Sequence, residues 1–235
     1  MKDATLKQDG KVLTLMEDVS CEQLQKLLGS GLLSDLLNSD VKRINRDEFR
    51  KVCGLKPVVR SWSEQDGVIR FTLPPTDNTT GPQWIERLET KGFKLSKWAK
   101  DVLNSQDFKP TNGVINEIVV LKGMLWNDNQ RTTKNIRAEA GNRGFTKPNA
   151  EVACLIREMF SDEEIEAMGF IWLVAMHEPI NDSVGGPSLL SALRGGDGQW
   201  LHAAFDGPGS GWLRGRGFAF VASQVVSTQD SAAQN

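Results

Sequence analysis

The stretch Phe170-Ile171-Trp172-Leu173-Val174-Ala175-Met176 is the longest unbroken apolar run in the chain. Ten of the chain's 22 glycines follow it, between Gly185 and Gly217, and they separate two further apolar segments, 199–205 and 217–226. Short apolar runs bounded by glycine are typical of strands joined by tight turns. We therefore predict three strands here. We expect them to pair antiparallel, because glycine connections of this kind leave no room for crossover helices.

Helical signals dominate the part of the chain before this region. Ser20 followed by Gln23 has the pattern of a capping box at a helix start, and the residues after it, up to position 54, carry leucines at helical spacing. Further on, Pro82 suits the first turn of a helix with Thr80 as its cap. Ser161 precedes an acidic first turn that suits the positive end of a helix dipole.

Two earlier segments favour strands. Two apolar runs, Val58–Trp62 and Val68–Leu73, are separated by Ser-Glu-Gln-Asp-Gly. Asp66-Gly67 within this connection is a turn signal, so a small hairpin is expected. The segment 113–121 is rich in β-branched residues. The predicted fold is therefore α+β, with helical N-terminal and central segments and a C-terminal antiparallel sheet.

The stretch from Pro74 to Gly81 has almost no apolar content and cannot continue a helix or a strand. It is either a long surface loop or a domain boundary. With a boundary here, residues 1–75 form a small helical region with the hairpin and 82–226 form an α+β domain. The last nine residues, 227–235, are small and polar, and we expect a disordered tail.

Composition excludes several classes of protein. The net charge of −2 disfavours a globally basic nucleic-acid binder. Cys21, Cys53 and Cys154 form no CxxC pair and are odd in number, so neither a disulfide framework nor a thiolate zinc site is expected. A seven-residue apolar run is far short of the roughly 20 residues that span a bilayer. We predict a cytoplasmic protein without a membrane anchor and without a cofactor.

The two histidines of the chain are the first candidate site. His177 ends the first apolar run and is followed by Glu178, and His202 lies in the second apolar segment. Histidine suits proton transfer near neutral pH, and carboxylates beside it would allow metal binding. If these strands are neighbours, His177, Glu178 and His202 could form a shared catalytic site. The alternative is that His177 only ends a strand before Pro179.

Cys154 is a second candidate, as a nucleophile paired with His177. It lies in a strongly amphipathic helix, where packing at the edge of the core is the simpler interpretation.

Glycine loops that carry arginine and tryptophan are the third candidate. Glycine N–H groups and arginine could hold a phosphate, but a strand pattern follows Gly217 where a phosphate loop would need a helix. Tryptophan and arginine together could instead bind a ligand or a peptide. The ligand-binding residues predicted on this basis are Trp212, Arg194, Arg214 and Arg216. We expect Trp212 to be exposed, and at least one of Trp172 and Trp200 to lie in the core.

A basic helix within 131–147 is the fourth candidate. Its glycine connection to the following helix resembles the outline of a helix-turn-helix. The following helix carries Glu151 and Glu158, which is a poor face to turn toward phosphates. Nucleic-acid binding is therefore disfavoured, and a solvated basic face is the better interpretation.

Two main hypotheses on function remain. The favoured one is a non-catalytic binding or interaction protein that uses the loops between 182 and 217 to hold a protein or small-molecule ligand. The competing one is a small acid–base or metal-assisted hydrolase centred on His177, Glu178 and His202. Nucleic-acid binding through 131–147 is a third and weaker hypothesis.

Overall fold

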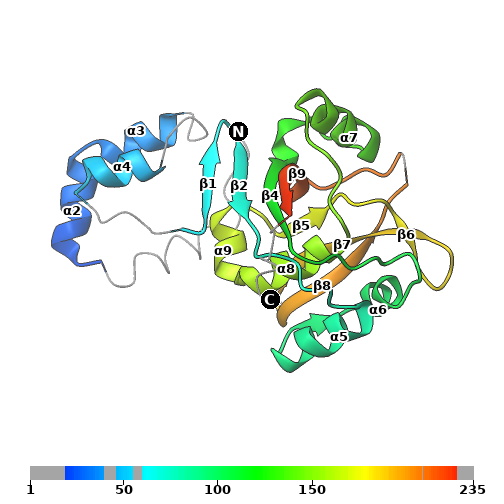
Figure 1. The fold of residues 1–235 in the computed structure, drawn as a ribbon. Coiled ribbons are helices and arrows are strands. Elements are labelled where there is room, and N and C mark those ends of the chain that lie inside the picture. The colour runs from blue at the N-terminus through cyan, green and yellow to red at the C-terminus, as the bar shows by residue number, and fades with distance from the viewer. Residues whose placement is uncertain (1–18, 40–45, 55–59, 208, 227–235) are drawn as a thin grey trace, which may run out of the picture. The chain divides into compact units, whose positions relative to one another are not determined.

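The computed structural model describes residues 19–39, 46–54, 60–207 and 209–226 (Figure 1). The chain divides into two compact units, Met1–Val59 and Arg60–Asn235. The stretch from Pro74 to Gly81, which we considered as a boundary, lies within the second unit. The predicted tail, 227–235, lies outside the described residues.

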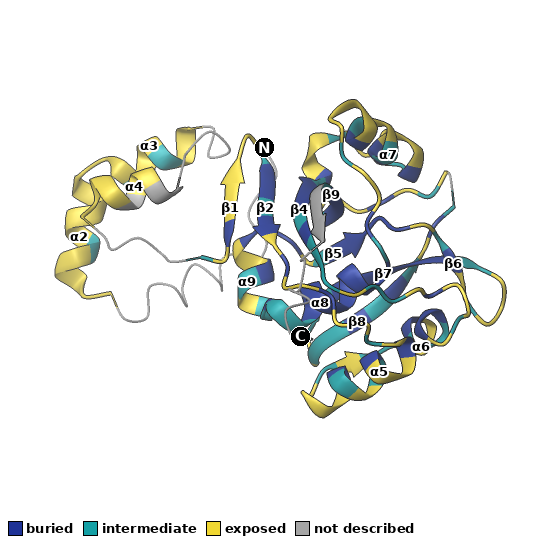
Figure 2. Cartoon of the chain, viewed as in Figure 1, coloured by how far each residue is buried: buried dark blue, intermediate teal, exposed yellow. Residues whose placement is uncertain are grey.

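The first unit contains three short helices, α2 (Cys21–Gly29), α3 (Leu32–Asn38) and α4 (Arg46–Val52). The predicted capping box begins α2: the Gln23 N–H donates to Ser20 Oγ at 3.2 Å, and the Ser20 N–H donates to Gln23 Oε1 at 2.9 Å. Gly31, at φ 76°, separates α2 from α3. Neither α2 nor α3 has a buried residue, and both ribbons are yellow or teal in Figure 2.

The second unit is built on one nine-stranded sheet with the order β1-β2-β4-β9-β5-β7-β8-β3, in which β6 pairs with β7 off this path. The strands are β1 (Trp62–Gln65), β2 (Val68–Thr72), β3 (Lys94–Leu95), β4 (Val114–Lys122), β5 (Trp172–Ala175), β6 (Ile180–Asn181), β7 (Pro187–Gly195), β8 (Gly198–Phe205) and β9 (Arg216–Val226). The hairpin is β1–β2, and Asp66 and Gly67 both have positive φ in its turn, at 52° and 73°. Its first strand begins at Trp62, where the predicted strand ends.

The sheet is mixed, so the prediction of a purely antiparallel sheet confined to the C-terminus is wrong. Strand β5 pairs parallel with β9, and β3 pairs parallel with β8. The prediction failed because it assumed that strands adjacent in sequence are adjacent in space. In the structure the chain leaves β5, forms β6, β7 and β8, and returns to place β9 on the other side of β5.

Helices bury both faces of this sheet, and on one face the loop between β8 and β9 adds to them. Along β4, Ile118 and Val120 belong to one core cluster, whereas Val119 and Leu121 belong to the other, because successive side chains of a strand point to opposite faces. The first cluster includes residues of α5 (Gly81–Thr90), α6 (Lys97–Leu103), α8 (Glu151–Met159) and α9 (Asp162–Ala167). The second cluster includes residues of α7 (Thr133–Asn142) together with Trp212.

The helix starts follow the sequence signals. Thr80 and Gln83 form a capping box at α5, with Pro82 in the first turn. Ser96 and Ser161 accept backbone N–H groups at the starts of α6 and α9. A short 3₁₀ helix, η2 (Gly123–Leu125), follows β4.

Two findings bear on the predicted class of protein. Cys21, Cys53 and Cys154 are all free thiols. Among the described residues, no helix combines the length and the apolar character that crossing a membrane requires.

Candidate functional site

A shallow groove of about 420 Å³ lies on the face of the sheet that carries α7. It is built where β5 and β9 begin and along the second half of β8, and the loop after β8 forms one wall. Its lining residues are Trp172, His202, Ala203, Ala204, Phe205, Ser210, Gly211, Trp212 and Arg216. They come from segments far apart in the sequence, which the parallel pairing of β5 with β9 brings together: Trp172 lies opposite Arg216 in that register.

Arg216 is the cation of this groove. Its guanidinium carbon lies 4.0 Å from the centre of the Trp172 ring and 5.3 Å from that of Trp212. Its Nε is buried without a hydrogen-bond partner, and within the described part of the chain no hydrogen bond or ion pair of the side chain is found. Burial lowers the pKa of Arg216 from its ordinary value. A partly desolvated cation without an anionic partner costs free energy that a bound anion would offset.

Trp212 is buried, with 6% of its surface exposed, so the prediction that it is exposed is wrong. The prediction considered only its glycine-rich neighbours, whereas distant residues cover the ring. Its indole N–H donates to Thr133 Oγ1 at 2.9 Å, and its ring packs against Phe218 at 5.6 Å between centroids. Its backbone N–H donates to the Arg131 carbonyl. These contacts fix the ring as a rigid wall of the groove.

His202 lies in β8 with its ring 5.1 Å from the Trp172 ring. The side chain is half-buried, and its Nδ1 is buried without a hydrogen-bond partner. Burial lowers the pKa of His202, and the nearby Arg216 charge lowers it further, against an opposing backbone contact at Ala203. Burial and the Arg216 charge therefore both favour the neutral form of the His202 imidazole.

His177 is placed differently from His202. Its ring is buried, its Nε2 accepts the Leu190 N–H at 2.9 Å, and its Nδ1 lies 2.6 Å from the Glu178 carbonyl oxygen. Both ring nitrogens are therefore used inside the protein. The Glu178 carboxylate is exposed and forms an ion pair with Lys147. Neither His177 nor Glu178 lines the groove that contains His202.

The other two predicted arginines also lie outside the groove. Arg194, in β7, donates to the Phe170 carbonyl and lies 3.3 Å from a carboxylate oxygen of Glu166. Arg214 is exposed in the loop before β9. The structure thus brings together His202, Trp212 and Arg216 from the predicted set, adds Trp172, and leaves the remaining residues elsewhere. We expected at least one of Trp172 and Trp200 in the core, but both are half-buried.

Metal and nucleophile chemistry receive little support. Within the described ranges, no group of three or more His, Cys, Asp and Glu side chains is placed to hold a metal ion. Cys154 is completely buried in α8, and burial raises the pKa of its thiol well above the ordinary value. A buried thiol with a raised pKa is a poor nucleophile.

Most of the basic side chains of 122–147 already have carboxylate or carbonyl partners within the chain. Lys122, Arg137, Arg143 and Lys147 form ion pairs with Glu64, Asp206, Glu139 and Glu178 in that order. Arg131 is buried and donates to the carbonyls of Gly123, Trp126 and Trp212. Lys134 remains as an exposed cation of this set, which is a weak electrostatic surface for a nucleic acid.

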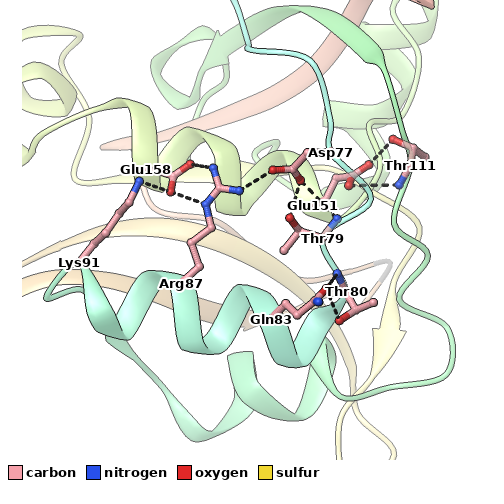
Figure 3. Close-up of polar contacts among 9 residues, drawn as sticks. All are labelled: Asp77, Thr79, Thr80, Gln83, Arg87, Lys91, Thr111, Glu151 and Glu158. Carbon is pink, nitrogen blue, oxygen red and sulfur yellow. Dashed lines mark hydrogen bonds and ion pairs between the residues drawn. The ribbon is translucent and has the colours of Figure 1, made fainter.

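A second polar cluster, drawn in Figure 3, was not found from the sequence. Arg87 of α5 holds Glu158 of α8 through two hydrogen bonds, at 2.7 and 2.5 Å, and reaches Asp77 at 2.6 Å. Lys91 donates to the same Glu158 at 2.6 Å. These groups satisfy one another and tie α5, α8 and the loop before α5 together, so the cluster is structural.

Comparisons with protein-family models, with curated proteins and with solved structures find no match to this chain.

Proposed function

We propose that the chain is a non-catalytic binding protein, that its site is the groove around Arg216, and that its ligand carries an anionic group. The observation that supports this proposal is the state of Arg216: a half-buried guanidinium between two tryptophan rings, with no carboxylate paired to it in the described residues. Arginine in such a position is suited to planar anions, which accept two of its N–H groups at once.

The contacts of His177 weigh against the hydrolase hypothesis. A general base needs a free nitrogen within hydrogen-bond reach of its substrate, and both nitrogens of His177 have partners. A shared site of His177, Glu178 and His202 stays a prediction without a supporting contact. Cytoplasmic location also stays a prediction, made from the number and spacing of the cysteines and from the lack of a long apolar run.

Ligand-induced stabilisation tests the proposal. A panel of small organic anions, each paired with its neutral amide, is screened by thermal unfolding, since a ligand that binds the folded state raises Tm. We expect anions to raise the Tm of the wild type and not that of Arg216→Gln. Arg194→Gln is the matched control, because it removes a half-buried arginine outside the groove. Equal shifts in wild type and Arg216→Gln would refute the proposal.

A further inference from the structure

The groove also restricts the class of anion, an inference that rests on the proposed function. We infer that its ligand is a small molecule with a single carboxylate on a flat, apolar body, and that the groove binds a phosphate ester of the same body more weakly.

The count of charges in the groove is the first step. Among the lining residues, Arg216 carries the one fixed charge, and the other residues are histidine, tryptophan, phenylalanine, alanine, glycine and serine. Burial and the Arg216 charge favour the neutral form of the one histidine, His202. A carboxylate brings one negative charge, whereas a phosphate monoester brings about 1.5 to 2 at neutral pH. One guanidinium balances the carboxylate. With a phosphate, negative charge would stay uncompensated in a partly desolvated site, at a cost in affinity.

The orientation of Arg216 is the second step. A guanidinium carbon 4.0 Å from the centre of the Trp172 ring lies over the face of that ring. Stacking uses the flat face of the guanidinium and leaves the N–H groups in its plane for hydrogen bonds. An edge of the guanidinium presents two parallel N–H groups, which match the two oxygens of a carboxylate. His202 lines the same groove with its ring, while its Nδ1 is buried away from it.

The rest of the lining describes the body of the ligand. Phe205 has 61% of its surface exposed and Trp172 is half-buried, while Ala204 and Gly211 have side chains too small to fill the groove. Such a surface suits an aromatic or other flat apolar group. A volume of about 420 Å³ lies in the range of small-molecule sites.

Four probes test this inference by calorimetric titration of the full chain: 1-naphthoate, 1-naphthyl phosphate, 1-naphthamide and a short free-acid peptide that ends in phenylalanine. We expect 1-naphthoate to bind about tenfold more tightly than each of the others, which is the size expected for one charge-assisted contact. Arg216→Gln should lose this advantage, Arg216→Lys should keep part of it, and Arg194→Gln should keep all of it.

Each outcome has a separate meaning. Tighter binding of the phosphate overturns the restriction to carboxylates and leaves the proposed function standing, and tighter binding of the peptide overturns the choice of a small molecule. Binding of 1-naphthoate that Arg216→Gln leaves unchanged, with native circular dichroism, overturns the proposed function itself. Absence of binding by all four probes overturns the inference, while the wider anion panel still tests the function.

Discussion

His177 accepts the backbone N–H of Leu190 through Nε2 at 2.9 Å, while its Nδ1 faces the Glu178 carbonyl oxygen at 2.6 Å. A carbonyl oxygen only accepts, so the proton is on Nδ1 and the ring is the neutral tautomer. This buried ring links the end of β5 to the middle of β7. Protonation of Nε2 would break the bond to Leu190 and place a charge in the core.

Acid should therefore destabilise the protein through His177. Burial lowers the pKa of His177 from 6.5 to about 4, although the Glu178 carbonyl opposes the shift. Between these values the unfolded chain binds the proton and the folded chain does not, so stability falls as pH falls from about 6.5 to about 4. We expect a loss of about 3 kcal/mol in the free energy of unfolding, measured by urea denaturation across this range. His177→Gln should flatten the profile, and a profile with the same slope in this variant would contradict the assignment.

Gly81 should not tolerate a side chain. A Cβ at this position would lie 1.7 Å from the backbone oxygen of Leu103, where α5 meets α6. Gly81→Ala must push the two helices apart, and we expect a loss of about 3 kcal/mol. Gly141→Ala is the control: this glycine lies in α7 with open space around it, so the change should stabilise by about 0.5 kcal/mol. Equal effects of the two substitutions would show that the α5–α6 contact is wrong.

The ion pair Arg87–Glu158 should contribute more to the stability of the fold than an exposed Arg–Glu pair does. Burial acts to raise the pKa of Glu158, but the cations Arg87 and Lys91 outweigh it and the pKa is lowered. Arg87→Met should raise that pKa, seen by NMR titration, and lower stability by about 2 kcal/mol, because the Glu158 side chain is only 12% exposed. Arg143→Met breaks the exposed pair with Glu139 and should cost less than about 0.5 kcal/mol.

Arg131 should affect both the stability of the fold and ligand binding in the groove. It is buried and donates to Gly123 O at 2.6 Å and to Trp212 O at 3.1 Å, so it holds the Trp212 wall against η2. Arg131→Lys keeps the charge but cannot reach all these carbonyls, and we expect a loss of about 3 kcal/mol together with weaker binding of 1-naphthoate. Lys134→Met, at an exposed site three residues later, should change neither quantity. Unchanged binding in a folded Arg131→Lys would separate Arg131 from the groove.

Local signals predicted local structure. Capping residues such as Thr80 and Ser161 begin helices where expected, because a cap bonds within the next turn of the same helix. The Asp66-Gly67 turn was predicted for a similar reason: positive φ is needed at the two residues themselves. The basic helix expected within 131–147 is α7, which ends at Asn142 before Gly144, at φ 75°.

Structure that depends on distant residues was not predicted. Strand β7 was missed because Gly185-Gly186 marked a turn and its serines and alanines lack β-branching; its strand character comes from pairing with β5 and β8. The groove was found in part. His202, Trp212 and Arg216 were named from their residue types, but the stacking of Arg216 on Trp172 requires the parallel β5–β9 register. The Arg87–Glu158 pair joins positions 71 residues apart and left no local signal.

The position of β9 has a consequence for biosynthesis. This strand is the last of the sheet to leave the ribosome, yet its neighbours are β4 and β5, with β1 and β2 beyond one and β7, β8 and β3 beyond the other. Until β9 is synthesised, β4 and β5 each lack a neighbour on the side that β9 will occupy. Any half-sheets formed by the earlier strands therefore have unpaired edges at β4 and β5. Such edges invite pairing with other chains, so a nascent chain of this protein should need a chaperone's protection until its final strand emerges.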